Sequence, residues 1–306
     1  MFIKHRKKFF ALSVAVIIIG IVLCIVRGIE LDIEFKGGSV VEYSYTGEID
    51  EKIADDIITE ALGQQITVQR TKNIADDSTK LIVNVAGNEA LSTEQRMAMT
   101  QALEKQWPGQ NWEIASSQLI NPVIGHEMLR NGILAMIIAS VLIIAYVWFS
   151  FRQMSGPSAG VMALVALFHD ITIASIAFVL TGSAINETLI AVILTILGFS
   201  INDTIVVYDR IRENLSLPDN DGKPFEEVVE MSIRQSLTRT INTSLCMFIA
   251  VLIAYIFAIA YGLESIKEFA LPILVGIISG TYSSIFIASP LWVSWKTRGG
   301  RSGYES

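Results

Sequence analysis

Six long apolar stretches constrain this chain more than any other feature of its sequence. Each is about 20 residues long, the length at which a helix spans a hydrocarbon core of about 30 Å. They are Phe9 to Val26, Asn131 to Phe151, Ser158 to Leu180, Thr188 to Tyr208, Asn242 to Tyr261 and Phe269 to Trp295. Because 52% of the 306 residues are hydrophobic and only 17% are charged, the composition agrees with an integral membrane protein. The sequence therefore predicts a membrane bundle of six transmembrane helices.

The longest polar region lies between the first two apolar stretches, from Arg27 to Arg130. Hydrophobic and polar residues alternate around Val41 to Tyr45 and around Leu81 to Val85, as in half-buried strands. A capping box at Ser92 and Gln95 indicates the start of a helix. The predicted order is strand, helix, strand, strand, helix, strand, which suits a ferredoxin-like α+β domain inserted between the first two helices.

Basic residues in the short connections predict the orientation of the helices, because Lys and Arg flanks are retained on the cytoplasmic side. They occur before the first span, after the second, between the fourth and fifth, and after the sixth. The members of this set are Lys4, Arg6, Lys7, Lys8, Arg152, Arg210, Arg212, Lys223, Arg234, Arg239, Lys296, Arg298 and Arg301. Both termini are therefore expected in the cytoplasm, with the α+β domain on the other side.

This pattern divides the chain into four parts. We expect a cytoplasmic N-terminus and the first helix in residues 1–30, and the extracytoplasmic α+β domain in residues 31–126. Residues 127–296 would hold helices two to six with a cytoplasmic loop at 209–240, and residues 297–306 a cytoplasmic tail. The outer domain is acidic, which disfavours nucleic acid as a partner. An acidic surface generally serves solubility, and a specific basic client is the alternative.

The sequence lacks common signatures of covalent chemistry. It has neither a P-loop nor an H-E-x-x-H zinc motif, so we do not expect an ATPase, a metalloprotease or another enzyme. Cys24 and Cys246 both fall in predicted spans and lack metal-binding spacing. The first apolar stretch could alternatively be a cleaved signal peptide, but it is long for one and no A-x-A-like site follows, which favours an uncleaved anchor.

Asp203 stands inside the fourth apolar stretch, where bulk water cannot solvate a carboxylate. Placing an ionised Asp near a bilayer centre costs roughly 2.5–3.5 kcal/mol, so such residues usually face protein or a wet cavity and often mark ion routes. Thr195 and Ser200 fall in the same polar sector of the helix. The alternative is an inert hydrogen bond between helices.

The fifth span begins with polar residues that are candidate partners of Asp203. Arg239 and Thr243 are spaced i to i+4 and project together, with Asn242 adjacent. Because the fourth and fifth helices run in opposite directions, we expect Asp203 and Arg239 at similar depth, where their opposite charges can meet. The alternative is that Arg239 is an ordinary basic flank of a span.

Other polar or small residues of the spans suit packing as well as function. His169 and Asp170 are consecutive in the third span and point about 100° apart, so we expect that both do not face one cavity. Gly276, Gly280, Ser284 and Ala288 recur every fourth residue, a stripe that lets helices approach closely.

The segment from Pro224 to Thr240 has an apolar face and acidic residues in its first turn, which predicts a helix lying along the membrane surface.

Four strings in the chain resemble the SecF branch of the SecD/SecF family, bacterial protein-export membrane subunits of the resistance-nodulation-division superfamily. They are LDIEFKGGSV at residues 31–40, FHD at 168–170, GFSINDTIVVYDRIREN at 198–214 and LTRTINTS at 237–244. They occur in family order over nearly the whole chain. The family usually has Asp three residues before the glycine pair Gly37 and Gly38, whereas this chain has Glu34 there and Asp32 two residues earlier.

The resemblance implies a six-span subunit of a bacterial inner or plasma membrane that pairs with SecD. It would act beside the SecYEG channel on translocating preproteins, using the proton motive force in late export and release. By position, Asp203 matches the carboxylate of the ion pathway and Arg239 and Thr243 match its polar partners. Asn202, Asn242 and Asp170 are further candidates for the pathway, and Glu34, Gly37 and Gly38 form the motif near the outer domain. We expect no cofactor other than the coupling ion, H⁺ or Na⁺.

Burial favours the neutral form of Asp203 whereas a nearby arginine favours the charged form, so a change in their separation could switch protonation. Two alternatives stay open. One is a non-conducting scaffold of the translocase, in which alanine at Arg239 or Thr243 would be tolerated. The other is a small-molecule or lipid exporter of the same superfamily, which the short outer domain and the string at 198–214 disfavour.

Overall fold

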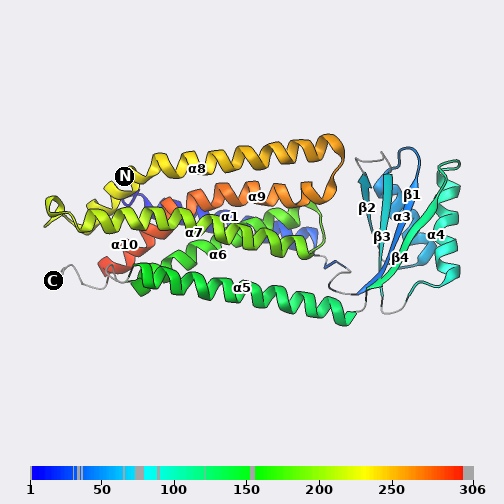
Figure 1. The fold of residues 1–306 in the computed structure, drawn as a ribbon, viewed down its shortest axis with the longest axis horizontal. Helices are drawn as coiled ribbons and strands as arrows, with labels where there is room; N and C mark the ends of the chain where they lie inside the picture. Colours follow the sequence, from blue (N-terminus) through cyan, green and yellow to red (C-terminus); the bar gives the residue numbers. More distant parts are fainter. Residues whose placement is uncertain are drawn as a thin grey trace.

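The computed structural model describes residues 2–298 except 30, 33, 34, 36, 65, 73–78, 88, 89, 121 and 152–155. It consists of a long helical bundle with a small α/β unit at one end (Figure 1). Helix α1 begins, and helix α10 ends, at the end of the bundle that lies away from the sheet.

The bundle contains the six long helices that the sequence predicts. They are α1 (Arg6–Arg27), α5 (Pro122–Ser150), α6 (Gly156–Thr181), α7 (Glu187–Leu215), α8 (Phe225–Tyr261) and α9 (Glu264–Ser283). Helix α9 continues through a π-helical turn, η3 (Ser284–Ala288), into α10 (Ser289–Arg298). In the described part of the chain these six helices are long and apolar enough to cross a membrane, which confirms the predicted number of spans.

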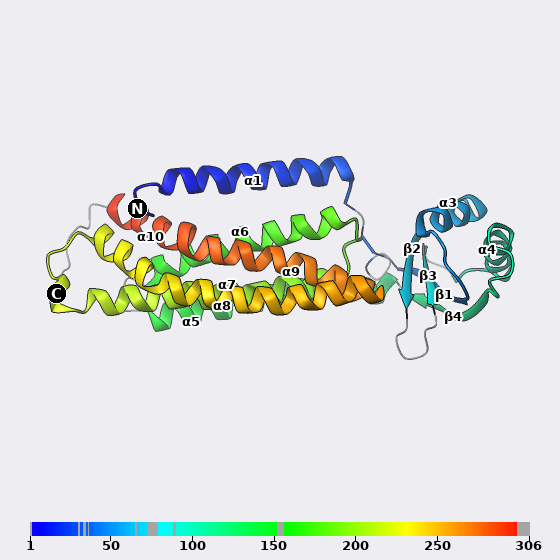
Figure 2. The same cartoon turned by 90° about the horizontal axis from the view of Figure 1, so that it is seen from above.

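Helix α9 occupies the centre of the bundle and packs against α6, α7 and α8. Helix α1 lies on the outer side of α6, and α5 packs on α6 and α7 (Figure 2). The small-residue stripe of α9 lies against α7, because a Cβ added to Gly276 would stand 2.3 Å from Ile196 Cδ1. At Gly280 an added Cβ would stand 3.1 Å from Ser200 Cβ. The predicted packing role of this stripe is confirmed.

Helix α8 corrects the prediction of a separate helix along the membrane surface between Pro224 and Thr240. The segment belongs to one continuous helix of 37 residues, about 55 Å long at 1.5 Å per residue. Its apolar face is covered by protein, since Val229 and Ile233 are fully buried in a core cluster with Tyr208 and Trp292. An apolar stripe has the same sequence pattern whether lipid or protein covers it, which explains the error.

The α/β unit has the element order that the alternation predicts. Its strands are β1 (Gly38–Tyr45), β2 (Ile66–Lys72), β3 (Thr79–Ala86) and β4 (Glu113–Ile120), and its helices are α3 (Glu51–Leu62) and α4 (Thr93–Gln106). The strands form one antiparallel sheet in the order β2-β3-β1-β4. Inward residues such as Tyr43 and Val83 pack on Ile58 and Met99 of the two helices. The predicted capping box of Ser92 and Gln95 is present at the start of α4.

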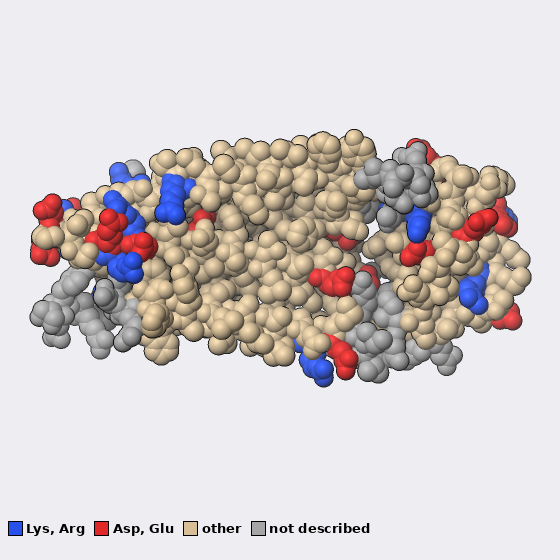
Figure 3. Space-filling model, in the orientation of Figure 1, with Lys and Arg blue, Asp and Glu red and all other residues tan. Residues whose placement is uncertain are grey.

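Charged side chains gather towards the two ends of the molecule, and the middle of the bundle carries almost none on the face in Figure 3.

The α/β unit meets the bundle through a short parallel bridge between Leu31 and Ile185. The Asp32 amide donates to the Ile185 carbonyl at 3.0 Å, and the Ser183 hydroxyl donates to Glu268 Oε1 at 3.0 Å. The loop between α6 and α7 therefore contacts both the segment that leads into β1 and helix α9.

Candidate functional site

Two carboxylates are buried within the helical bundle, Asp170 on α6 and Asp203 on α7. Their exposed fractions are 0% and 1%, so neither can be solvated by bulk water or by headgroups. Hydroxyl side chains from α7, α8 and α9 surround them. This polar layer is the candidate functional site, because a buried carboxylate within a membrane span needs such partners.

Asp170 accepts hydrogen bonds from two neighbouring helices. The Ser200 hydroxyl of α7 donates to Oδ2 at 2.6 Å, and the Ser279 hydroxyl of α9 donates to Oδ1 at 2.6 Å. The Ser283 hydroxyl of α9 also donates to Oδ2, at 2.5 Å. These contacts account for both carboxylate oxygens and tie α6, α7 and α9 together.

His169 belongs to the same cluster, which corrects the expectation that His169 and Asp170 do not share a cavity. Its Nδ1 lies 3.0 Å from Asp170 Oδ1 and 3.5 Å from Ser279 Oγ, and its ring is 6% exposed. Because α1 and α9 cover a wide sector of α6, side chains 100° apart both enter protein. The Nε2 atom of this ring is buried and has no hydrogen-bond partner among the described residues.

The cluster extends to α1 through an aromatic side chain of α9. The Tyr282 ring stacks on His169 with centroids 6.2 Å apart, and its hydroxyl donates to the Phe9 carbonyl at 2.9 Å. Ser13 of α1 lies 3.5 Å from the same hydroxyl. The first helix is therefore fastened to the centre of the bundle beside the Asp170 cluster.

On α7, Asp203 lies about one turn beyond Ser200. It is about 24 Å along the helix from Glu187, at 1.5 Å per residue. Its Oδ2 accepts from the Ser244 hydroxyl of α8 at 3.1 Å. Ser244 in turn accepts from the Thr281 hydroxyl of α9 at 2.7 Å and lies 2.8 Å from the Thr240 carbonyl. A three-helix contact among α7, α8 and α9 thus forms around this carboxylate.

The predicted ion pair between Asp203 and Arg239 is wrong for the described part of the chain. Arg239 is exposed, and so is Thr243, whose hydroxyl donates to the Arg239 carbonyl of its own helix at 2.8 Å. The residue of α8 that contacts Asp203 is instead Ser244, and Thr240 is buried one turn before it on the same helix. They have the same i to i+4 spacing one position further along, so they lie about 100° around the helix.

Asn202 and Asn242, the two amides predicted for the ion pathway, are also exposed. Asn202 of α7 lies on the outer side of Asp203, and Asn242 of α8 is exposed next to Thr243. The structure therefore divides the predicted ion-pathway residues into two groups. Asp203 and Asp170 are buried, whereas Asn202, Arg239, Asn242 and Thr243 lie on the open surface of α7 and α8.

Several residues of the polar layer were not predicted as functional: Thr240, Ser244, Ser279, Thr281 and Ser283. The string SGTYSS at residues 279–284 was a usable signal, since it places four hydroxyl side chains and a tyrosine inside an apolar span. These hydroxyls lie beside the small-residue stripe of the same helix, whose spacing by itself indicates packing.

The motif near the outer domain is described only in part. Glu34 lies outside the described residues. Gly37 has φ of +80°, the left-handed region that favours glycine, and its carbonyl accepts from the Gly87 amide at 3.4 Å. Gly38 begins β1 against Val85 of β3. The backbone conformation at Gly37 and the close approach of Gly38 to Val85 therefore explain both glycines structurally.

The arrangement is suited to accepting and releasing a small cation. Each carboxylate can take a proton, and the surrounding hydroxyls can both donate and accept. Among the described residues no group of three His, Cys, Asp or Glu side chains could hold a metal ion.

Comparisons with known proteins agree with this picture of the bundle. The family described as "Protein export membrane protein SecD/SecF, C-terminal" matches residues 99–298. The protein translocase subunit SecF of Rhodothermus marinus is 35% identical over 303 residues, which cover 97% of this chain and 93% of the relative. The protein translocase subunit SecDF of Bacillus subtilis is 32% identical over 97% of this chain, which spans only 38% of the relative.

A solved structure is similar over the same extent. The crystal structure of SecDF, a translocon-associated membrane protein from Thermus thermophilus, has a TM-score of 0.78 and 30% identity. The match covers 97% of this chain and 38% of that one.

Proposed function

Since this chain belongs to the SecD/SecF family of protein-export membrane proteins, we propose that it is a multi-pass subunit of a Sec protein-translocation machinery. Together with SecD it uses a transmembrane gradient of H⁺ or Na⁺ to assist late export and the release of preproteins at a SecYEG channel. The role is transport without covalent chemistry.

The observation that carries the proposal is the burial of Asp203 inside a membrane span, with Ser244 as its hydrogen-bond donor. A carboxylate in this environment loses hydration and is stabilised by one neutral hydroxyl, so small changes of its surroundings shift the balance between its charged and neutral forms. A proton moving down the membrane potential gains about 2.3 kcal/mol per 100 mV, enough to bias two conformations of an assembly.

Asp170 is a second carboxylate of the proposed pathway. Ser200 donates to it and lies one turn from Asp203 on α7, while Ser283 is followed directly by Ser284, which contacts Thr204 at 2.9 Å. Polar groups of α7, α9 and η3 therefore extend from Asp170 to Thr204, the residue that follows Asp203. This supports a route on which ions meet both acids in turn.

The exposed polar face of α7 and α8 supports SecD as the partner. Arg239, Asn242, Thr243 and Asn202 are poor neighbours for acyl chains, so a second helical body is expected to cover them. Two matched proteins are named SecDF, and this chain spans only 38% and 36% of them, which leaves room for a SecD part in the same polypeptide.

The α/β unit is proposed to be an extracytoplasmic domain of ferredoxin-like type, with both chain termini in the cytoplasm. Its element order and its sheet order support the ferredoxin-like topology. The basic residues at the end of the bundle where α1 begins support the orientation. The chain is proposed to divide into residues 31–126 and 127–296, close to the start of α5 at Pro122.

Export into membrane vesicles under separately imposed H⁺ and Na⁺ gradients tests the proposal, comparing wild type with Asp203→Asn. The variant should keep its association with SecD and lose the gradient-dependent part of export. Asp209→Asn is the matched control, because Asp209 is exposed on the same helix and pairs with Arg212. Full stimulation of export in Asp203→Asn would refute the ion-coupling role.

A non-conducting scaffold is the second candidate, and the outward position of Arg239 favours it. If this arginine only fastens α8 to a partner, Arg239→Ala should support gradient-dependent export whenever the complex with SecD still assembles. Under the leading proposal, an assembled Ser244→Ala complex, which lacks the hydroxyl that donates to Asp203, should be defective, whereas a scaffold role predicts normal export from it. Co-purification with SecD, measured beside export, separates the two.

A further inference from the structure

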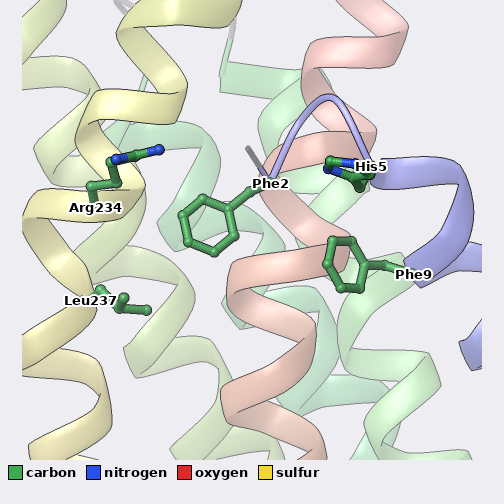
Figure 4. Close-up of a pocket in the computed structure, with 5 residues that line it drawn as sticks. All are labelled: Phe2, His5, Phe9, Arg234 and Leu237. Atoms are coloured by element: carbon green, nitrogen blue, oxygen red, sulfur yellow. The ribbon is translucent and has the colours of Figure 1, made fainter.

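A groove opens between the start of α1 and helix α8, at the end of the bundle away from the sheet (Figure 4). Its volume is about 370 Å³, and its lining residues are Phe2, His5, Phe9, Arg234 and Leu237. Apolar side chains make up most of the wall. The guanidinium of Arg234 and the ring of His5 lie towards one end of it (Figure 4).

The groove is fixed by hydrogen bonds between the N-terminal segment and α8. The Glu230 carboxylate accepts from the amides of Phe2 and Ile3, both at 3.0 Å. Arg6 pairs with Glu226 at 3.0 Å, one turn earlier on α8. The residues that precede α1 are therefore held against α8.

Aromatic rings form the inner wall. The rings of Phe2 and Phe9 both pack on Phe286 of η3, with centroids 5.6 and 4.3 Å apart. Leu237 faces them from α8 and packs on the core of the bundle. A flexible acyl chain would find apolar contacts on both sides of the groove.

The groove lies where the apolar spans begin. The apolar stretch of α1 starts at Phe9, and that of α8 starts at Asn242, about one turn after Leu237. Its apolar wall is thus at the depth of the outermost acyl carbons, and Arg234 is at the depth of the headgroups. A molecule with a polar headgroup and an apolar chain matches this order of polar and apolar surfaces.

The charge at the headgroup end is positive on balance. Arg234 is 61% exposed in its side chain, with Nε 3.6 Å from Glu230, whose oxygens already accept two backbone amides. Lys4, Lys7 and Lys8 are exposed on the same end of α1. An anionic group is therefore favoured over a zwitterionic one.

We propose that this groove binds an anionic phospholipid of the adjacent leaflet. Its phosphate is held by Arg234 and His5, and an acyl chain lies between Phe2, Phe9 and Leu237. The lipid then connects α1 to α8, two helices that flank η3 and α9. A soluble phosphate lacks the apolar part, and a protein segment would have to supply an acidic group and an apolar chain at the same membrane depth.

Native mass spectrometry of the purified full chain tests the site. The probes are phosphatidylglycerol and phosphatidylcholine with identical acyl chains. Wild type should retain phosphatidylglycerol about tenfold better than phosphatidylcholine, as expected for one charge-assisted hydrogen bond. Arg234→Gln should lose most of this preference. Arg212→Gln is the matched control, because Arg212 lies at the same end of the bundle but contacts Ser150 and Phe151.

A second variant tests the apolar half of the groove. Leu237→Trp fills it and should lower the retention of both lipids, while the circular dichroism spectrum stays that of wild type. Equal retention of the two lipids by wild type, or equal loss in Arg234→Gln and Arg212→Gln, would overturn the proposal. So would displacement of the lipid by inorganic phosphate, or full lipid retention by a folded Leu237→Trp variant.

Discussion

Gly38→Ala should weaken the four-stranded sheet of the α/β unit, because the position has no room for a methyl group. Gly38 begins β1 and pairs with Ala86 of β3 and Ile120 of β4. A Cβ added here would lie 2.3 Å from the carbonyl oxygen of Val85. This is about 1 Å short of an ordinary contact. Because the oxygen belongs to the backbone of a paired strand, it cannot turn aside as a side chain would.

The expected magnitude follows from the cost of overpacking. Forcing an extra methyl into a filled site costs about 1–3 kcal/mol, and here the free energy of opening the β1–β3 ladder should fall by that amount. Amide exchange of the peptides that cover β1 and β3 should accelerate roughly 5- to 140-fold, since 1.4 kcal/mol is a factor of ten. Hydrogen exchange followed by mass spectrometry on the full chain in detergent measures this directly.

Gly87→Ala is the control from the same corner of the sheet. An added Cβ at Gly87 has no atom within 4 Å, so the substitution should be neutral or stabilise by about 0.4–1 kcal/mol. Exchange at β1 and β3 in Gly38→Ala that matches both wild type and Gly87→Ala would refute the steric argument. It would also imply that the close approach of β1 to Val85 does not require glycine at position 38.

Two further predictions concern the bundle and the outer domain. Asp170→Ala removes the acceptor of three buried hydroxyls and should lower the stability of the bundle by roughly 3 kcal/mol. Thermal unfolding in detergent measures it, and a result equal to that of Ser140→Ala, whose hydroxyl bonds only its own helix α5 at Met136, would contradict it. Burial raises the pKa of Tyr45 to about 12 from 10.0, so the folded domain keeps this phenol neutral while the unfolded chain ionises it. The stability that Tyr45 contributes should be complete below pH 10 and vanish as the pH rises towards 12, and near-ultraviolet circular dichroism melts should show a smaller loss over this window in Tyr45→Phe.

The architecture was predictable because it rests on patterns that one sequence carries in full. The length of an apolar run alone identifies a span, and the six runs correspond to six helices. Period-two alternation gave β1 and β3, and the capping box gave the start of α4. These features depend on neighbours in the chain, and tertiary contacts leave them unchanged.

Which polar face of a helix is buried could not be predicted in this way. On α8, Arg239 with Thr243 and Thr240 with Ser244 have identical spacing, and only the packing of α7 and α9 selects the second pair. For α6, the 100° between His169 and Asp170 argued against a shared cavity, yet α1 and α9 together cover both directions. Burial is a property of the neighbours around a helix, so a single helix pattern leaves it open.

Helix α8 therefore has two polar surfaces, one buried against α7 and α9 and one exposed. Ser244 donates to Asp203 on the inner side, and Arg239 and Thr243 are exposed on the outer side, each one position before a residue of the inner pair. If a SecD subunit covers the outer side, protonation of Asp203 would weaken the hydrogen bond that holds the inner side to α7. We expect α8 to shift relative to α7 in response, because it is exposed along much of its length and α9 is its other main support. The state of the buried acid would then reach the partner through the movement of one helix.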